Sequence, residues 1–328
     1  MDNPNSWKEA NEYTQQIIKE FPEYEMDSER LLQESITKFY PSIKIEVERI
    51  VKQWNLIVRE MIRNETGLKL QHNEQYVQIP VRVQNGFPTA IKDIINKFQH
   101  PELWNLFLGR HRIQDTIPGF QIVNENYKHL NKVIANYPNY EDLAHMEKFM
   151  SKLFESLSFD EMFLDLKSLK VDLLGAYLFK KGEVIIHCDV IAFLALVYKI
   201  PLNCLTIIAL THELAHAYTH LGMDIDGIDW DTEAFSNSDL EVIEGMAQFY
   251  THVISEKMES KQPGVNYAFN ELLLHQSAPY LLHLKWLKDR KRVGEIMRQT
   301  ILEFRRIQVG RLIEFEGILY KKHHDFKS

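Results

Sequence analysis

The sequence predicts an α+β protein that is mostly helical and holds a small β-sheet. Apolar residues recur at helical spacing over long stretches, as in the segment from Ile43 to Met61. Strand-like patterns are confined to Tyr76–Val83 and to two runs between Val171 and Cys188. An apolar period of about 3.6 residues is typical of amphipathic helices, whereas half-buried strands alternate. Hydrophobic residues make up 45% of the chain and charged residues 26%, which indicates a globular protein with a buried core.

The first half of the chain is expected to be mainly helical. Pro22 and Pro41 interrupt the helical pattern, and Gly67 is placed to end the helix before it. The segment Tyr76–Val83 alternates and contains Pro80, so an edge strand or an extended loop is expected there. Helices are expected at Trp7–Glu20, Ser28–Phe39, Ser42–Asn64, Ala90–Gln99, Tyr127–Asn136 and Tyr140–Leu157.

The pattern changes near Leu169, which suggests a second domain. Two apolar runs, Val171–Phe179 and Glu183–Cys188, flank a turn that contains Gly182, and this arrangement predicts a β-hairpin. We therefore expect a mainly helical N-terminal domain over residues 1–160 and a second domain over residues 161–328. Helices of the second domain are expected from about Asp189 to Tyr198, from Pro201 to about His220, and at Trp286–Gln299 and Ile301–Glu314.

Composition argues against several classes of partner. The 328 residues carry 38 basic and 46 acidic side chains, a net charge of −8, which does not favour binding to nucleic acid.

The sequence also indicates where the protein is located. The polar N-terminus lacks the features of a signal peptide, and two cysteines suit a reducing compartment, so a cytoplasmic location is expected. The most apolar stretch, Val184 to Leu210, is too interrupted to span a membrane. Its interruptions are His187, Asp189, Lys199, Pro201 and Asn203.

The segment His212-Glu213-Leu214-Ala215-His216 has the spacing of a zinc site. Residues four apart lie on the same face of a helix, so His212 and His216 can bind one ion together. Glu213 would lie beside the metal, where a carboxylate can take a proton from a zinc-activated water. An apolar sequence precedes the motif, so the helix is expected to be buried and rigid. The motif predicts Zn²⁺ as the cofactor.

A catalytic zinc needs a third protein ligand, and several carboxylates and one histidine are available. His220 lies a further turn along the helix and is expected to be too distant. The acidic loop lacks the regular spacing of a calcium site and reads as a solvated connection. Its carboxylates are Asp224, Asp226, Asp229 and Asp231.

Glu244 is the preferred third ligand, with Glu241 in reserve. Ser238 and Glu241 have the spacing of a capping box, which would start a helix and assign Glu241 to the backbone amides. Glu244 then falls in the second turn of that helix, among apolar residues. Gly245 and Ala247 are small, as expected where this helix approaches the zinc helix closely.

Two motifs of the chain resemble those of the gluzincins, a family of zinc peptidases whose best-known member is thermolysin. The gluzincin pattern is HExxH followed by ExxA, and here it is matched by His212-Glu213-Leu214-Ala215-His216 and then by Glu244-Gly245-Met246-Ala247. The resemblance covers roughly Leu169–Lys257. It implies a peptidase domain with a small β-sheet, an active-site helix and a helical C-terminal subdomain, acting on a peptide or protein substrate. It also implies that Glu183–Asp189 is an edge strand that binds an extended peptide by β-addition.

The resemblance further implies an oxyanion donor, a Tyr or His in the C-terminal subdomain. Tyr280 is preferred because it follows a proline at an expected helix start, and His275 and His283 are the alternatives. Asp229, Asp231 and Gln248 are available to orient the ligand histidines. Two other functions stay open, a zinc hydrolase that does not cleave peptides and a catalytically silent binding protein.

Overall fold

The structure is a computed structural model in which the chain forms two compact units. The first unit comprises Met1–Phe39 and Thr89–Leu166, and the second comprises Tyr40–Pro88 and Lys167–Ser328. Residues 40–88 therefore belong to the same unit as the second half of the chain. The residues described are 28–72, 75–76, 78–97, 108–109, 173–224, 227–287, 293–307 and 310–325. The helices expected at Trp7–Glu20, Tyr127–Asn136 and Tyr140–Leu157 lie outside them.

Two helices are described at length in the first unit, α2 (Ser28–Phe39) and α4 (Thr89–Lys97). They contact each other through their apolar faces, and an ion pair of 2.8 Å joins Lys92 to Glu29. Both helices agree with the segments expected from the sequence.

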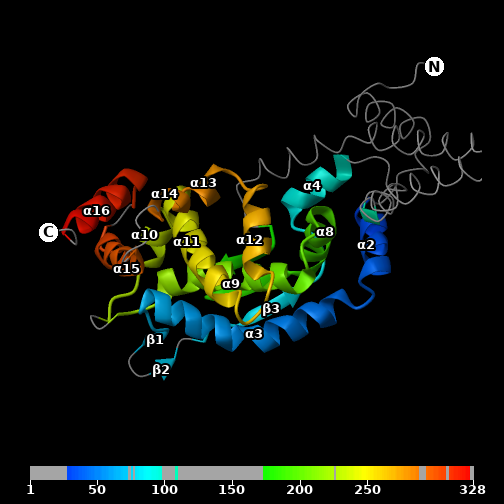
Figure 1. The fold of residues 1–328 in the computed structure, drawn as a ribbon, viewed down its shortest axis with the longest axis horizontal. Helices are drawn as coiled ribbons and strands as arrows, with labels where there is room; N and C mark the ends of the chain where they lie inside the picture. Colours follow the sequence, from blue (N-terminus) through cyan, green and yellow to red (C-terminus); the bar gives the residue numbers. More distant parts are fainter. Residues whose placement is uncertain are drawn as a thin grey trace, which may run out of the picture. The chain divides into compact units, whose positions relative to one another are not determined.

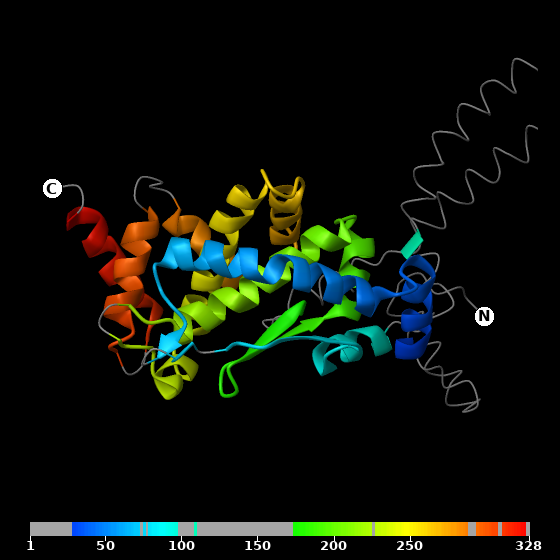
Figure 2. The ribbon, with the colours of Figure 1, turned by 90° about the horizontal axis from the view of Figure 1, so that it is seen from below.

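The second unit contains a three-stranded sheet in the order β3-β5-β4. Strand β4 (Gly175–Leu178) and strand β5 (Glu183–His187) form the expected antiparallel hairpin, with Gly182 at a φ of 60° in its turn. Strand β3 (Val81–Gln84) follows Pro80 and pairs with β5 in parallel at the edge of the sheet. The edge strand or extended loop expected over Tyr76–Val83 is thus a strand at Val81–Val83, whereas residues 78–80 lie outside any strand. The sheet lies beside the helices of this unit, and its strands run side by side in Figure 2.

The expectation that Glu183–Asp189 forms a sheet edge is wrong. Strand β5 is central, because β3 occupies one side of it and β4 the other. The partner β3 comes from much earlier in the chain, and no local pattern reveals such a pairing. The free edges of this sheet among the described strands belong to β3 and β4.

The helix that carries the His-Glu motif is the centre of the second unit. This helix, α9 (Leu202–Leu221), agrees with the helix expected from Pro201 to about His220, with Pro201 at its N-cap and Gly222 at its C-cap. Its side chains are almost all buried, because α3 (Ile43–Thr66) packs on it from one side and α11 (Leu240–Met258) from another. Figure 1 shows α9 running between α3 and α11. Burial on all sides holds the helix rigidly.

The apolar stretch from Val184 to Leu210 is divided between β5, α8 (Cys188–Tyr198) and the first half of α9. Over the part of the chain that the structure describes, no helix is long and apolar enough to cross a membrane.

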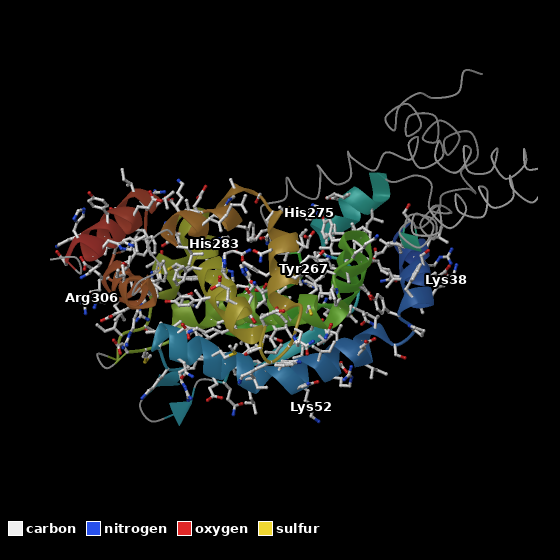
Figure 3. The ribbon with its side chains drawn as sticks, viewed as in Figure 1. Lys38, Lys52, Tyr267, His275, His283 and Arg306 are labelled. Atoms are coloured by element: carbon white, nitrogen blue, oxygen red, sulfur yellow. The ribbon has the colours of Figure 1, made fainter. Side chains whose placement is uncertain are left out.

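Helix α3 has one buried face and one exposed face. It ends at Gly67, whose φ of 66° is the left-handed conformation that favours glycine and whose N–H bonds the carbonyl of Arg63. Ile62 is fully buried on this helix, whereas Leu56 is 77% exposed. Lys52 points away from the unit in Figure 3. The helix predicted over Ser42–Asn64 is confirmed.

We expect Ile62→Ala to lower the free energy of unfolding by about 2–5 kcal/mol, because it removes buried methylene groups and leaves a cavity under α3. Leu56→Ala on the same helix is the matched control and should change that free energy by less than about 0.5 kcal/mol. Urea unfolding followed by circular dichroism measures both values. Equal losses for the two variants would contradict the packing of α3 on α9.

The capping box predicted at Ser238 and Glu241 is not formed. The N-cap of α11 is Asp239, and its carboxylate accepts hydrogen bonds from the backbone N–H of Leu312 and from Arg311. The Ser238 hydroxyl instead donates to the carbonyl of Ala234, 2.8 Å away. The chain near Leu312 returns to the start of α11, and this tertiary contact displaces the local cap.

The C-terminal helices begin and end later than the sequence predicted. The segments expected at Trp286–Gln299 and Ile301–Glu314 are replaced by α15 (Val293–Phe304) and α16 (Leu312–Asp325). The chain turns tightly at Gly310, where a Cβ atom would lie 2.4 Å from the Phe304 ring. The remaining elements are β1 (Gln71–His72), β2 (Gln75–Tyr76), α10 (Thr232–Ser236), α12 (Val265–Leu273), α13 (Ala278–Leu281) and α14 (His283–Trp286).

Candidate metal centre

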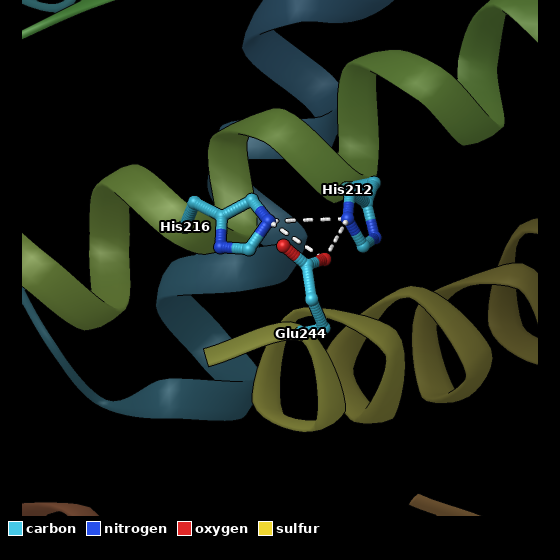
Figure 4. Close-up of side chains that lie close together, drawn as sticks. All are labelled: His212, His216 and Glu244. Atoms are coloured by element: carbon cyan, nitrogen blue, oxygen red, sulfur yellow. Dashed lines mark hydrogen bonds and ion pairs between the residues drawn. The ribbon is translucent and has the colours of Figure 1, made fainter. Parts of the chain in front are cut away.

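Three side chains converge between α9 and α11. Nε2 of His212 lies 3.2 Å from Oε2 of Glu244, and Nε2 of His216 lies 3.4 Å from the same oxygen. The two Nε2 atoms are 3.1 Å apart. All three residues are buried, and Figure 4 shows both imidazoles of α9 directed at the carboxylate of α11. The structure therefore brings together the three ligands predicted from the sequence.

The spacing of these atoms fits a small tetrahedral ion. Two ligand atoms at about 2.0–2.1 Å from zinc, separated by a tetrahedral angle, lie about 3.3 Å from each other. The three separations here, 3.1, 3.2 and 3.4 Å, cluster around that value. Among the described residues, His212, His216 and Glu244 form one group of side chains whose ligand atoms lie close enough together to hold a metal ion.

A metal ion also accounts for the burial of these groups. Removing an ionised carboxylate from water is costly unless a cation or hydrogen-bond donors compensate it. A divalent cation would compensate Glu244 and would bind both Nε2 lone pairs at once. Two imidazoles and one carboxylate are a donor set typical of catalytic zinc, with a further coordination position left open.

Glu213 lies in the same helix and faces the β-sheet. It is 1% exposed, and β4 passes close beside it. A Cβ atom on Gly175 would lie 2.8 Å from Cγ of Glu213 and 2.8 Å from the carbonyl oxygen of Ile185. Sequence reasoning missed Gly175, although a glycine inside a strand often marks such a close approach. The glycine makes room for the predicted general base.

If Glu213 has the catalytic role predicted from the sequence, Gly175→Ala should reduce the rate without removing a bound metal. The added methyl group would lie 2.8 Å from both Cγ of Glu213 and the Ile185 carbonyl oxygen, so the Glu213 side chain and the strand must shift, and displacements of about 1 Å can cost about 10²-fold in rate. Zinc content and kcat for peptide cleavage are the measurements. Gly294→Ala is the matched control, because nothing lies within 4 Å of its Cβ position. Unchanged kcat in Gly175→Ala would show that Glu213 tolerates the displacement.

Three residues were considered as oxyanion donors: Tyr280, His275 and His283. Among the ring contacts that the structure describes for them, that of Tyr280 is with His212. Its ring centroid is 6.0 Å from that of His212. His275 instead stacks on Tyr198 of α8, with ring centroids 3.9 Å apart. His283 is fully buried, and both of its ring nitrogens have partners. The geometry therefore favours Tyr280 among these candidates.

His220 and Asp224 have partners away from His212, His216 and Glu244, and Asp226 of the acidic loop lies outside the described residues. Nδ1 of His220 lies 2.9 Å from the hydroxyl of Tyr177 on β4, and its Nε2 lies 3.2 Å from the hydroxyl of Thr232. Burial lowers the pKa of His220 to about 4, so this imidazole is neutral at physiological pH. Asp224 pairs with Arg298 at 2.6 Å. His220 thus ties β4 to α9.

Two of the three residues available to orient the histidines, Asp231 and Gln248, form other hydrogen bonds. Asp231 caps α10 through the backbone N–H groups of Glu233 and Ala234, and Gln248 donates to Oε1 of Gln276 at 2.7 Å. Gly245 was expected to let α11 approach α9 closely, but the structure places another helix against it. A Cβ atom there would lie 2.6 Å from the Trp286 ring, so the glycine makes room for α14 and not for α9.

Comparisons of the chain with models of protein families, with curated proteins and with solved structures found no match.

Proposed function

We propose that the protein is a zinc-dependent peptidase of the gluzincin type. The observation that carries this proposal is the convergence of His212, His216 and Glu244 at separations of 3.1–3.4 Å, with Glu213 in the same helix. The residues fit zinc in donor type and in spacing. Zinc bound there would supply a Lewis acid that acidifies a water molecule and polarises the scissile carbonyl.

Glu213 is the general base in this proposal. A buried carboxylate next to the ligands can take the proton from the attacking water and later deliver it to the leaving amine. Tyr280 would donate a hydrogen bond to the carbonyl oxygen as negative charge develops on it. Glu213 is held on the buried helix α9, and Tyr280 lies on the short helix α13, which packs on α11.

The substrate is proposed to bind along β4 in place of β5. Strand β4 has a free edge among the described strands and passes beside Glu213 at Gly175. An extended peptide that adds to this edge would form backbone hydrogen bonds and bring a peptide bond towards the metal. Such binding depends on the backbone, and it favours peptides over small non-peptide substrates.

The proposal is tested by metal analysis and by a cleavage assay on a peptide library. The purified protein should contain one zinc per chain, and a chelator should abolish cleavage until zinc is restored. Zinc binding without cleavage of any peptide would instead support a non-peptidase hydrolase or a silent binding protein. Absence of stoichiometric metal would remove the proposal entirely.

A further inference from the structure

A second pair of buried histidines lies between α11 and α14. His252 is on α11, two helical turns beyond Glu244, and His283 begins α14. Nδ1 of His252 lies 3.1 Å from Nε2 of His283. The ring of Phe269 on α12 packs against both imidazoles, with centroids at 5.1 and 6.2 Å. Figure 3 shows His283 among the helices α11, α13 and α14.

The hydrogen bonds fix the direction in which this pair donates. Nδ1 of His283 lies 2.9 Å from the carbonyl oxygen of Tyr280. A carbonyl can only accept, so Nδ1 of His283 carries a proton and donates it. Burial and the neighbouring His252 lower the pKa of His283 to about 4, so its Nε2 is an unprotonated acceptor. His252 must then donate from Nδ1.

The outer end of the pair reaches a partly exposed carboxylate. Nε2 of His252 lies 3.6 Å from Oε1 of Glu256, one turn further along α11. A chain of side chains therefore runs from the surface, through two imidazoles, to the backbone of Tyr280. Glu244 and His252 share α11, so the same helix supplies one metal ligand and anchors the Tyr280 segment.

Helix α13 depends on such an anchor. It has four residues, and its N-cap Ser277 forms no side-chain capping bond. So short a helix has little stability of its own. The ring of Tyr280 nevertheless has to be held beside His212, 6.0 Å away between centroids.

We propose that His283, supported by His252, is a positioning residue that holds Tyr280 against the metal centre. This inference rests on the proposed peptidase function for its effect on rate, but the geometry that it describes can be measured without activity. His283 is not itself an oxyanion donor, because it is fully buried and both ring nitrogens are engaged.

Two substitutions separate the bonds of His283. Its replacement by Asn keeps an amide N–H near the Nδ1 position and so keeps the bond to Tyr280, whereas Gln keeps only the contact with His252. We expect His283→Gln to lower kcat at least about tenfold with KM changed less than about twofold, because Tyr280 is displaced. His283→Asn should retain most of kcat. Thermal unfolding of both variants checks that they fold.

The background of Tyr280→Phe provides the decisive kinetic control. If His283 acts through the Tyr280 hydroxyl, the difference between the Asn and Gln variants should vanish there, since coupled sites are non-additive. Equal losses of kcat for Asn and Gln, or the same ratio in the Tyr280→Phe background, would show a merely structural role and overturn the proposal.

NMR of the zinc-free protein with ¹⁵N-labelled histidine tests the geometry directly. We expect His283 in the Nδ1–H tautomer, a coupling across the bond to His252, and a Tyr280–His212 ring contact that His283→Gln loses and His283→Asn keeps. The opposite tautomer, or a ring contact insensitive to the Gln variant, would overturn the positioning role even if peptides are cleaved. If these signals hold but the wild-type protein cleaves no peptide, the proposed function fails and the positioning stands.

Discussion

Replacing Glu213 with Gln is expected to lower kcat for peptide cleavage by about 10²–10⁴-fold while zinc content stays unchanged. The amide has nearly the same shape as the carboxylate but cannot accept the proton of the attacking water. The side chain is 1% exposed and lies against Gly175, so no other group can readily move into its place. Initial rates on a cleaved library peptide, together with metal analysis of the same samples, give both quantities.

Glu241→Gln is the control for that variant. Glu241 is on α11, one turn before the ligand Glu244, and it is only partly buried. Its neutralisation should leave kcat within about twofold, as is usual for surface changes. Full activity of Glu213→Gln would remove the proposed base, whatever metal the protein contains.

Replacing Glu244 with Ala is expected to abolish stoichiometric zinc binding and, with it, cleavage. The substitution leaves two imidazoles, which is one protein ligand fewer than catalytic zinc sites provide. Without bound zinc, the variant should also lose the increase in the free energy of unfolding that zinc gives to the wild-type protein. Zinc at about 1,000 times its Kd should raise the free energy of unfolding of the wild-type protein by about 4 kcal/mol, because it binds only the folded state.

Urea unfolding with zinc and with a chelator measures this difference, and atomic emission gives the stoichiometry. The variant should show nearly the same unfolding curve under both conditions. Glu241→Ala tests the reserve ligand and should bind zinc as the wild type does. Retention of zinc by Glu244→Ala, with its loss in Glu241→Ala, would assign the third ligand to the other carboxylate.

Two of the three side chains that could hold a metal ion were predictable from the sequence because their geometry is local. Spacing of four residues places His212 and His216 on one face of any helix, and Pro201 marked where that helix starts. Glu244 required a further step, since two helices had to meet. Its apolar neighbours indicated burial, and a buried carboxylate needs a compensating partner.

The features that sequence reasoning missed depend on contacts between distant segments. Strand β3 makes β5 central, and the chain near Leu312 takes over the cap of α11. The bond between His252 and His283 joins two helices across 31 positions. None of these pairings leaves a periodic pattern, because each is set by how the helices and strands meet.

The membership of residues 40–88 in the second unit decides how the chain can be shortened. A fragment that starts at residue 161, at the boundary the sequence suggested, would lack α3 and β3. The face of α9 that packs on α3 would then be exposed to solvent. Strand β5 would become an edge strand of the sheet, and such edges are prone to self-association. A shortened protein for crystallography would therefore need residues 40–88 as well as 167–328.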